Sequence, residues 1–461
     1  MRREDAVFPK AFAVWFKDLG RWDAPSFQEV RWHWPEHVMA PIGSILKARK
    51  ERVDRNIHQF SDLQMITIHF DGTIDKRIVE ADLEYSMDLW FARPGDLVVA
   101  KIDLKNGAVG IITSDWPTCA VTGHFAVYES DQTKLVPEYL HRIIQLKFFK
   151  AHLWRNKVGA EGRKEVKLDF FLDQPIPLPD LDTQKHIVAH WRQVYDEIAA
   201  AQVRIEELKR ETDSRFFADL GLSSPDQLFL PKSFGVQWEE FRRWGVRFNQ
   251  LSQVGADISQ GTYPLVELNS ILDLVQYGTS EKANITNQGI PILRIGNIKE
   301  RAIDLGSLKH ISLPERTLNN LLLKDGDVLI IRTSGSRDLV GTCAVFRESG
   351  DYVFASYLIR LRFDFKKAVP EFISWFLNTP LGRQQVDAVS RQIMQNNINS
   401  EELGSLQIPL PPIDVQRQIM NRVEGRLSEI AQIRKYSNQR RKEIDAEIEA
   451  LILGTKKIKD D

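Results

Sequence analysis

The stretch IPLPDLDTQKHIV, residues 176–188, recurs in altered form as IPLPPIDVQRQIM, residues 408–420. Both copies contain a Pro-Leu-Pro segment, four variable residues and then a glutamine, Gln184 or Gln416. A long segment with helical periodicity follows each copy. Prolines directly before such a segment mark the start of a helix. The repeated joint therefore divides each half of the chain into a globular part and a long helix.

Other motifs recur in the same order, which indicates an internal duplication. The repeated pairs are PKAFAVWFKDLGRW (9–22) with PKSFGVQWEEFRRW (231–244), GDLVVAKID (95–103) with GDVLIIRTS (326–334), and VPEYL (136–140) with VPEFI (369–373). The same alignment pairs Gly110 with Gly341. A chain built from two similar halves is expected to carry two similar sites.

Composition limits the class of protein. The 461 residues include 43% hydrophobic and 27% charged residues, which is ordinary for a globular protein. The net charge of −1 means that any anion-binding surface is local. Two cysteines, Cys119 and Cys343, exclude a disulfide scaffold and suit a reducing compartment. The sequence has no membrane-length apolar run and no signal-peptide core, so we expect a cytoplasmic protein.

The globular halves are expected to mix short strands with helices. Apolar β-branched runs such as DLVVAKI and DVLIIRT lie between Gly, Asp and Pro, as in short twisted strands. A helical stretch is predicted from Pro137, and a matching one from Pro370 through PEFISWFLNTPLGRQQV, because proline suits the first helical position.

Two long helices are predicted, each from an aspartate cap to a glycine stop, at 182–221 and 414–454, and each ~58 Å long. Their apolar positions recur at heptad spacing, which is typical of coiled-coil pairing. In the first helix these are Ile187, Trp191, Val194, Ile198, Ala201, Ile205, Leu208 and Thr212; in the second they are Val423, Leu427, Ile430, Ile444, Ile448 and Leu451.

Two interpretations of the helices are open. They are either buried in one ordinary core or paired with each other as an intramolecular spacer, and the narrow apolar stripe favours pairing. Arg434, Ser437 and Arg441 interrupt the second seam, and they mark a looser stretch or a docking face for another protein.

The sequence thus predicts an α+β fold with a pseudo-twofold internal repeat, in which two tandem globular domains are separated by two long antiparallel helices. The expected divisions are a first globular domain with its leader (1–181), the central helix (182–221), the leader of the second repeat (222–261), a second globular domain (262–413), the distal helix (414–454) and a polar tail (455–461).

This arrangement resembles the specificity subunit of type I restriction–modification systems over almost the whole chain. GIPILRIGNIKERAIDL (289–305) followed by GDVLIIRTSGS (326–336) is similar to that family's target-recognition domain, and the PLPxxxxQ joint is its most specific short element. The first half departs from the pattern. Its segment QMITIHFDGTIDKRI (64–78) lacks the Pro-containing start and the Arg–Asn pair present as Arg294 and Asn297.

The resemblance implies a division of labour. Each globular domain would recognise one half of a split double-stranded DNA target, and the helices would hold the two domains at a fixed spacing. Two methyltransferase subunits would bind around the helices and motor–nuclease subunits would join them. The chain itself would be non-catalytic and hold no cofactor, whereas the partner subunits would use S-adenosylmethionine, ATP and Mg.

Simple geometry is compatible with that implication. Half-sites on one side of B-DNA lie about 34–36 Å apart, and an antiparallel pair of ~58 Å helices is long enough to set such a separation.

Catalytic alternatives are poorly supported. HWPEH (33–37) spells a zinc-protease pattern, but Pro35 opposes the helix that this motif needs. Glu165 and Lys167 fit the end of a nuclease carboxylate motif, at a spacing that chance produces often. The sequence has no NPPY-like adenine methyltransferase loop and no Gly-rich loop with Lys and Ser/Thr for nucleotide phosphates.

Two equivalent segments are candidates for DNA contact. Residues 141–170 hold eight Lys or Arg with interleaved aromatic residues, as beside a phosphate backbone, although a solvated helix face is an equal alternative. Residues 390–403, SRQIMQNNINSEEL, carry amides in that place, and Gln and Asn suit contacts to adenine, although a polar surface loop explains them equally well.

Base contacts are expected on loops, because strand side chains are needed for packing. The candidates are Lys47, Arg49, Lys101, Lys105, Asn106, Arg163 and Lys164 in the first half, and Tyr277, Arg294, Asn297, Arg332, Ser334, Ser336, Arg337, Gln395 and Asn396 in the second. Arg332 or Arg337 opposite guanine is the commonest such pairing, but Arg332 also suits a core carboxylate.

Two other functions remain open from the sequence. The chain also fits a protein-interaction scaffold that uses its long helices, or a detached recognition module of a fused restriction–methylation enzyme. A neighbouring gene for an adenine methyltransferase would favour DNA recognition over the scaffold.

Overall fold

The protein is described from a computed structural model of the full chain. The structure describes residues 32–54, 56–58, 63–77, 88–114, 116–159, 164–223, 233–238, 246, 249–250, 258–284, 288–392 and 396–457. The repeated segment at 9–22 and the greater part of its copy at 231–244 lie outside these residues.

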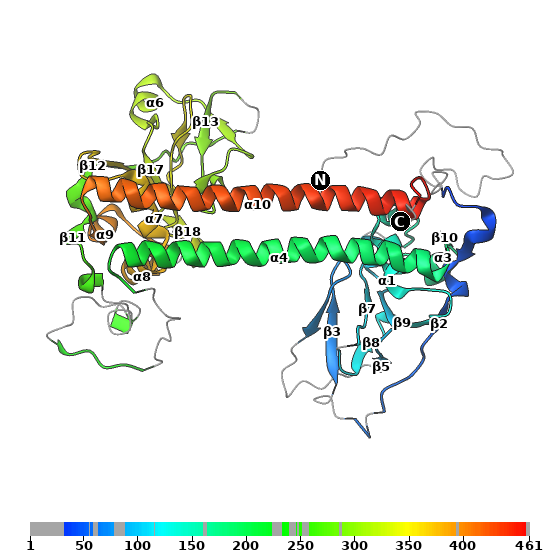
Figure 1. Ribbon diagram of the computed structural model, residues 1–461. Coiled ribbons are helices and arrows are strands. Elements are labelled where there is room, and N and C mark those ends of the chain that lie inside the picture. The colour runs from blue at the N-terminus through cyan, green and yellow to red at the C-terminus, as the bar shows by residue number, and fades with distance from the viewer. Residues whose placement is uncertain are drawn as a thin grey trace. The chain divides into compact units, whose positions relative to one another are not determined.

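The chain forms two compact units. Unit 1 comprises Met1–Ala200 and Tyr436–Asp461, and unit 2 comprises Ala201–Lys435. The boundaries between them fall inside two long helices, α4 (Leu181–Asp219) and α10 (Ile413–Leu453), which are drawn in green and in orange to red in Figure 1. Each unit therefore consists of one globular domain and one stretch of each helix.

The globular domain of unit 1 is built on two four-stranded sheets. Its strands are β1 (Met39–Pro41), β2 (Leu46–Ala48), β3 (Gln64–Ile68), β4 (Ile74–Arg77), β5 (Leu89–Ala92), β6 (Leu97–Ala100), β7 (Val109–Ile111), β8 (Cys119–Thr122), β9 (Phe125–Ser130) and β10 (Pro175–Pro177). One antiparallel sheet has the order β2-β9-β6-β7, and a mixed sheet has the order β4-β3-β8-β5. Its helices are α1 (Pro137–Gln145), α2 (Lys147–Arg155) and α3 (Leu168–Leu172), with 3-10 turns η3 (Glu36–Val38), η4 (Ile42–Ser44) and η6 (Leu104–Asn106).

The globular domain of unit 2 repeats this plan with additions. Its strands are β11 (Leu265–Glu267), β12 (Leu272–Tyr277), β13 (Ile290–Leu293), β14 (Ile298–Lys299), β15 (Ala302–Ile303), β16 (Lys309–Ile311), β17 (Val328–Ile331), β18 (Thr333–Ser334), β19 (Cys343–Val345), β20 (Val353–Phe354), β21 (Leu358–Phe363), β22 (Arg391–Gln392), β23 (Asn396–Asn397) and β24 (Gln407–Pro409). Its helices are α6 (Glu315–Leu321), α7 (Pro370–Asn378), α8 (Pro380–Val389) and α9 (Ser400–Gly404), with 3-10 turns η8 (Ile258–Gln260), η9 (Leu268–Ile271), η10 (Ile295–Asn297) and η11 (Arg337–Leu339). The main sheets have the orders β12-β21-β17-β19 and β16-β13-β20.

The strand registers show how the two domains correspond. Leu97 of β6 lies opposite Ile111, and its counterpart Val328 of β17 lies opposite Val345. This register pairs Gly341 with Gly107, so the predicted equivalence of Gly341 and Gly110 is wrong. Both Gly107 and Gly341 are left-handed, with φ of 90° and 82°, so they have the same backbone role. The constant sequence offset failed here because the loop between β6 and β7 is shorter than the loop between β17 and β19.

The repeated Pro-Leu-Pro joint forms the same structure twice. Each joint supplies one strand of a two-stranded pair, β1 with β10 and β11 with β24. Gln184, which is 0% exposed, donates to the carbonyls of Lys134 and Pro179 and accepts from the backbone of Val136, each at 2.8 Å. Gln416 makes the equivalent three bonds to Lys367, Pro411 and Val369, at 3.0, 2.8 and 2.8 Å. The motif glutamine therefore fastens each long helix to its own globular domain.

The predicted helix caps are corrected at the N-termini and confirmed at the C-termini. Asp180, not Asp182, caps α4, because its carboxylate accepts from the Thr183 backbone amide at 2.8 Å. Asp414 lies inside α10, whose first backbone bonds run to the carbonyl of Pro412.

At the other ends, Gly221 and Gly454 are left-handed, with φ of 70° and 80°. The backbone bonds Leu222 to Phe217 and Thr455 to Ala450 complete the same glycine-stop motif in both helices.

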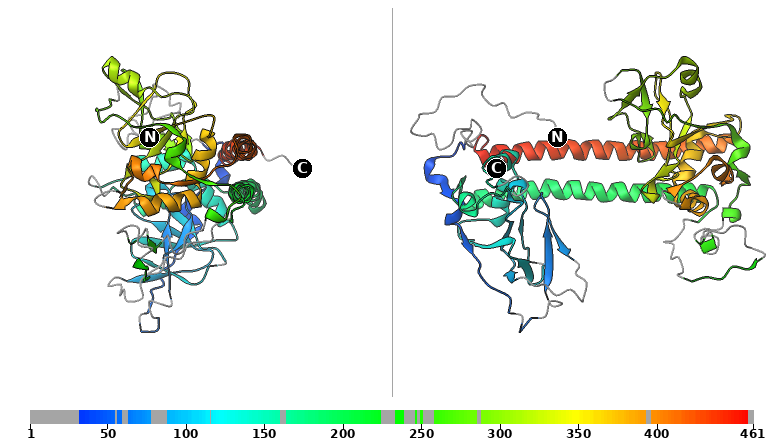
Figure 2. Two further views of the ribbon diagram at one scale, coloured as in Figure 1. Left: turned by 90° about the vertical axis from the view of Figure 1, so that its left-hand side faces the viewer. Right: turned by 180° about the vertical axis from the view of Figure 1, so that it is seen from behind.

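The long helices pair antiparallel within each unit, as predicted, and the views in Figure 2 agree on this pairing within unit 2. In unit 1, Ile187 and Val194 of α4 share a buried cluster with Ile444, Ile448 and Leu451 of α10. In unit 2, Ile205 and Leu208 pack against Ile430. Leu427 was predicted in the seam, but it is 41% exposed, because the helix turns Val423 and Ile430 inward instead.

The helical stretch predicted from Pro370 is divided in two. Pro380 has no amide hydrogen to continue α7, so a second helix, α8, begins there. The Thr379 side chain caps it and accepts from the Gly382 amide at 3.3 Å. The starts of α1 and α7 at Pro137 and Pro370 are as predicted.

Candidate nucleic-acid interface

Several candidate residues of unit 2 meet at one end of its antiparallel sheet. Tyr277 ends β12 opposite Ile359, and Arg332 follows β17, whose last residue lies opposite Leu358. The guanidinium carbon of Arg332 is 4.6 Å from the centre of the Tyr277 ring, so the two side chains stack. The Arg332 Nε is buried with no hydrogen-bond partner among the described residues.

The amide-rich segment comes to the same end of the sheet. β18 pairs with β23, which places Ser334 opposite Asn396, and the Ile398 amide donates to the Arg332 carbonyl at 2.9 Å. The Tyr277 hydroxyl accepts from the Ser400 amide at 3.0 Å. Gln395 lies outside the described residues, and only the backbone of Asn396 is described.

Ser336 and Arg337 continue this edge. Ser336 is exposed and precedes η11, and its amide donates to the Ser334 hydroxyl at 3.1 Å. The Arg337 guanidinium lies 3.5 Å from the Asp387 carboxylate of α8. That ion pair holds Arg337 partly against the domain, so Arg332 is the better placed of the two arginines.

The prediction for Asn297 is corrected by its burial. Asn297 is 1% exposed, accepts from the Arg294 amide at 3.0 Å and donates to the Asp304 carbonyl at 2.9 Å. Its amide group is thus used to hold a loop and does not reach DNA bases. Arg294 lies at the start of this loop, where one guanidinium nitrogen donates to the Ser307 carbonyl at 3.4 Å.

In unit 1, Lys101 takes the place of Arg332. The Lys101 amide donates to the His124 carbonyl, just as the Arg332 amide donates to Tyr357. The Lys101 ammonium donates to the Gly123 carbonyl at 2.7 Å, and Asn106 donates to Asp103 at 2.9 Å. The exposed aromatic ring of Tyr357 and the backbone role of His124 were not predicted, because neither residue belongs to a recognisable motif.

Three lysines, Lys105, Lys157 and Lys164, form a cluster near the loop that follows Lys101, where the Lys105 ammonium donates to the Ile102 carbonyl at 2.9 Å. The Lys105 ammonium donates to the Lys164 carbonyl at 2.6 Å, and Lys157 lies over the ring of Trp154. Burial lowers the pKa of Lys157, and the like charges of Lys164 and Lys105 lower it further. An anion placed among these ammonium groups would relieve their repulsion, which suits a phosphate. Arg163, the other candidate in this loop, lies outside the described residues.

Arg49 and Lys47 do not join this cluster. The Arg49 guanidinium binds both oxygens of the buried Asp96 carboxylate, at 2.6 and 3.0 Å, and the hydrogen bond to Asp96 is the main cause of its raised pKa. Because Arg362 binds Asp327 in the same bidentate way in unit 2, we correct Arg49 to a residue that supports the sheet. Lys47 is exposed opposite Glu129, toward the other end of β9.

Two of the three candidate docking residues on α10, Arg434 and Arg441, have local partners. Arg434 binds Glu300 at 2.7 Å, and Arg441 lies 5.8 Å from the Tyr195 ring centre. The Ser437 hydroxyl is buried without a hydrogen-bond partner among the described residues.

A groove of about 680 Å³ lies between α4 and α10 in unit 2. Its lining residues are Glu211, Thr212, Arg215, Phe216, Asp219, Ile419, Arg422, Val423, Gly425, Arg426 and Glu429. A side chain added at Gly425 would meet nothing within 4 Å, so this glycine leaves the groove open.

The described residues contain neither a membrane-spanning helix nor a metal-binding cluster. No helix there is long and apolar enough to cross a membrane. No group of three or more His, Cys, Asp or Glu within the same residues is arranged to hold a metal ion.

The fold and the twice-repeated sheet edge define a duplicated recognition protein, and sequence comparison gives its family. Residues 44–210 and 262–443 match the model of the type I restriction modification DNA specificity domain. These matches span most of the chain, which therefore belongs to this family and consists of two such domains with α4 between them.

Curated relatives are similar to parts of the chain. The type I restriction enzyme EcoKI specificity subunit of Escherichia coli (strain K12) is 27% identical over 298 residues, which are 63% of this chain and 60% of that protein. The StySPI specificity subunit of Salmonella potsdam is 31% identical over 163 residues, 35% of each protein. The chain thus spans less than two thirds of the length of either relative in these matches.

Solved structures are similar across a larger share of the chain. The HsdS subunit from Thermoanaerobacter tengcongensis covers 90% of this chain over 96% of its own length, with 16% identity and a TM-score of 0.40. The type I restriction–modification S subunit from M. genitalium covers 90% of this chain over 95% of its own, with 11% identity and a TM-score of 0.44.

Proposed function

We propose that this chain is the DNA sequence-specificity subunit of a type I restriction–modification complex, and that each globular domain recognises one half of a bipartite target. The observation that carries the proposal is the duplicated sheet edge. Arg332, which stacks on Tyr277, and Lys101 occupy equivalent ends of equivalent sheets, and Lys105 of the lysine cluster bonds to the Ile102 carbonyl next to Lys101. Membership of the DNA specificity domain family supports DNA as the target of this edge.

The two edges suggest different recognition chemistry. Unit 2 offers an arginine stacked on tyrosine with serine hydroxyl groups beside it, which suit hydrogen bonds to base edges in the major groove. Unit 1 offers clustered ammonium groups, which suit phosphate oxygens. We infer that the second half-site is recognised more through bases, and the first more through backbone contacts.

The proposed role is non-catalytic. The sequence lacks an adenine methyltransferase loop and a nucleotide-binding loop, so methyl transfer and ATP use would belong to partner subunits. These partners would be two methyltransferase subunits docked on the long helices, and motor–nuclease subunits that join them. S-adenosylmethionine, ATP and Mg would be bound by the partners, and the complex would act in the cytoplasm.

The direct test is methylation-sensitive sequencing of the host genome with and without this gene. The proposal requires a bipartite adenine-methylated motif that disappears when the gene is deleted and returns when it is supplied in trans. A methylome that is identical in both strains would contradict it.

A further inference from the structure

The turn between β14 and β15 has an unusual backbone. β14 and β15 pair Ile298 with Ile303 and Lys299 with Ala302, so Glu300 and Arg301 alone form the turn. Both are left-handed, with φ of 47° and 69°, and they are the non-glycine residues with positive φ in the described part of the chain. Turns of this kind favour Asn-Gly, since longer side chains are strained there. Glu300 and Arg301 therefore occupy a strained turn, which fixes where their two side chains lie.

The two side chains reach two different long helices of unit 2. Glu300 binds Arg434 of α10 at 2.7 Å. Arg301 binds both carboxylate oxygens of Asp213 of α4, at 3.3 and 3.5 Å, and lies 4.4 Å from the centre of the Trp375 ring. The Glu300 side chain is 71% exposed, whereas the Arg301 side chain is only 30% exposed. Arg301 therefore makes the better shielded contact of the two.

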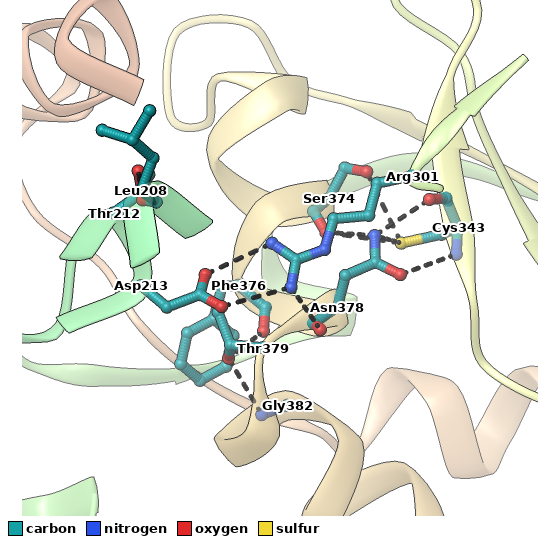
Figure 3. A network of polar contacts seen from close by, with 10 residues as sticks. All are labelled: Leu208, Thr212, Asp213, Arg301, Cys343, Ser374, Phe376, Asn378, Thr379 and Gly382. Atoms are coloured by element: carbon teal, nitrogen blue, oxygen red, sulfur yellow. Dashed lines mark hydrogen bonds and ion pairs between the residues drawn. The ribbon is translucent and has the colours of Figure 1, made fainter. Parts of the chain in front are cut away.

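Arg301 is also tied to the core of the domain, as Figure 3 shows. It donates to the Asn378 carbonyl at 3.3 Å, where α7 ends. The Asn378 side chain donates to the carbonyls of Cys343 and Ser374, at 2.9 and 2.8 Å, and accepts from the Cys343 amide. One guanidinium thus joins α4, α7 and, through Asn378, strand β19.

The same hairpin is continuous with the candidate DNA-binding loop. Asn297, which fixes the Arg294 loop, directly precedes β14, and the Asp304 amide after β15 donates to the Asn297 carbonyl at 2.7 Å. Lys299 and Asp304 add an ion pair across the base of the hairpin. A shift of the hairpin relative to the helices would therefore carry the Arg294 loop with it.

Unit 1 has a comparable contact made from different residues. Arg142 of α1 lies 3.8 Å from the centre of the Trp191 ring of α4, and Tyr195 beside it donates to Asp445 of α10 at 2.9 Å. Both units therefore place an arginine–tryptophan stack, with an aspartate of a long helix, where the globular domain meets the helices.

We propose that Arg301, through Asp213 and Trp375, is a positioning residue that fixes the orientation of the second recognition domain on the helix pair. Arg301 does not contact DNA in this account. It sets the angle at which the Tyr277–Arg332 edge and the Arg294 loop are presented, and so it sets which spacer between half-sites the protein accepts. That last consequence rests on the proposed function.

The orientation can be measured without DNA. Spin labels at Val203→Cys on α4 and Glu315→Cys on α6 would report the distance between helix and domain within unit 2, because Val203 is 58% exposed and Glu315 is exposed. The native Cys119 and Cys343 are buried, and burial raises their thiol pKa to about 11, so they should stay unlabelled.

The expected result is one narrow distance distribution in the parent protein and a broadened one in Arg301→Ala. Arg301→Gly relieves the turn but also removes the guanidinium, so it should broaden the distribution equally. Asp213→Ala should act like Arg301→Ala, and the double variant should be no worse. Glu300→Ala, which removes an exposed ion pair to α10, and Arg316→Ala, which removes an exposed charge of α6, should leave the distribution narrow. The proposal would be overturned if both Arg301 variants gave the narrow distribution of the parent protein. It would also be overturned if Arg301→Ala gave a broad distribution while Arg301→Gly gave a narrow one.

A second arm tests the consequence for DNA. The second arm uses the complex with the methyltransferase partner. In Arg301→Ala, the preference in binding affinity for one spacer length over others should fall about fivefold, which corresponds to ~1 kcal/mol. Both half-site sequences should be unchanged. If the parent complex shows no spacer preference at all, the proposed function fails while the spin-label result stands. If the parent is selective and Arg301→Ala is equally selective, the positioning role is overturned.

Discussion

The side-chain carbonyl of Gln416 accepts a hydrogen bond of 2.8 Å from the backbone amide of Val369. This single contact links the first turn of α10 to the start of α7, and Gln184 makes the same contact with Val136 in the other unit. The shared geometry in two diverged copies explains why the joint contains a glutamine at this position, since no shorter or charged side chain satisfies the same three backbone groups.

Gln416→Ala should be strongly destabilising. It leaves one buried amide and two carbonyls without their partner and opens a small cavity, which together cost about 2–4 kcal/mol. Urea denaturation of the parent and variant would measure the decrease in stability. Gln418→Ala, an exposed change two residues later in the same helix, should alter stability by less than about 0.5 kcal/mol. Equal decreases in both variants would contradict the role given to Gln416.

Arg332→Ala should weaken recognition of one half-site. A good bidentate contact to a base discriminates by about 1–3 kcal/mol, so binding to the full target should fall roughly 5- to 150-fold. Competition with targets that are mutated in either half would show which half-site no longer contributes. Arg337→Ala should cost less, because Asp387 already holds that guanidinium. A uniform decrease over all DNA sequences would indicate that Arg332 contacts only phosphate.

The lysine cluster should determine the salt dependence of binding. Replacing Lys105, Lys157 and Lys164 with glutamine should reduce the slope of log affinity against log salt by about one for each DNA phosphate that is no longer neutralised. The measurement is a salt titration with a fluorescent target. Lys47→Gln removes an exposed lysine of the same domain away from the cluster and should leave the slope unchanged. A cluster variant with the parent slope would show that these lysines do not meet DNA.

Gly425 offers a test of partner docking on the helices. Gly425→Ala should stabilise the chain by up to about 1 kcal/mol, because glycine disfavours a helix interior and the added methyl group meets open space. Gly425→Trp should instead fill the groove and reduce co-purification of the methyltransferase subunits. Glu424→Trp adds the same bulk to an exposed neighbour outside the groove and serves as control. Unchanged partner recovery with Gly425→Trp would remove the groove from the docking surface.

The comparison of sequence with structure shows which inferences a pattern supports. Heptad spacing located the helix seam because burial follows periodicity, and the glycine stops were clear because the left-handed turn favours glycine. The N-terminal cap of α4 was misplaced because two aspartates, Asp180 and Asp182, lie near its start, and only geometry shows which one accepts a backbone bond. The cap of α10 was misplaced because the helix begins at Ile413, one residue before the single aspartate Asp414.

The site was harder to predict than the fold. Tyr277, Arg332 and Ser334 could be chosen from the sequence because each lies at or just after the end of a recognisable strand, and the structure places them at one edge. Asn297 and Arg49 were misassigned because composition does not reveal whether a polar side chain is already bound within its own domain. The partnership of Arg301 with Asp213 joins residues far apart in sequence, and no local pattern announces it.

The central claim is that one globular domain recognises one half of the target. Residues 262–407 can be replaced by the equivalent segment of a related protein with a different specificity, and the methylated motif can then be determined by long-read sequencing of a host that supplies the methyltransferase. We predict that one half of the motif changes to that of the donor protein while the other half is unchanged. A motif in which both halves change, or in which neither does, would contradict the account.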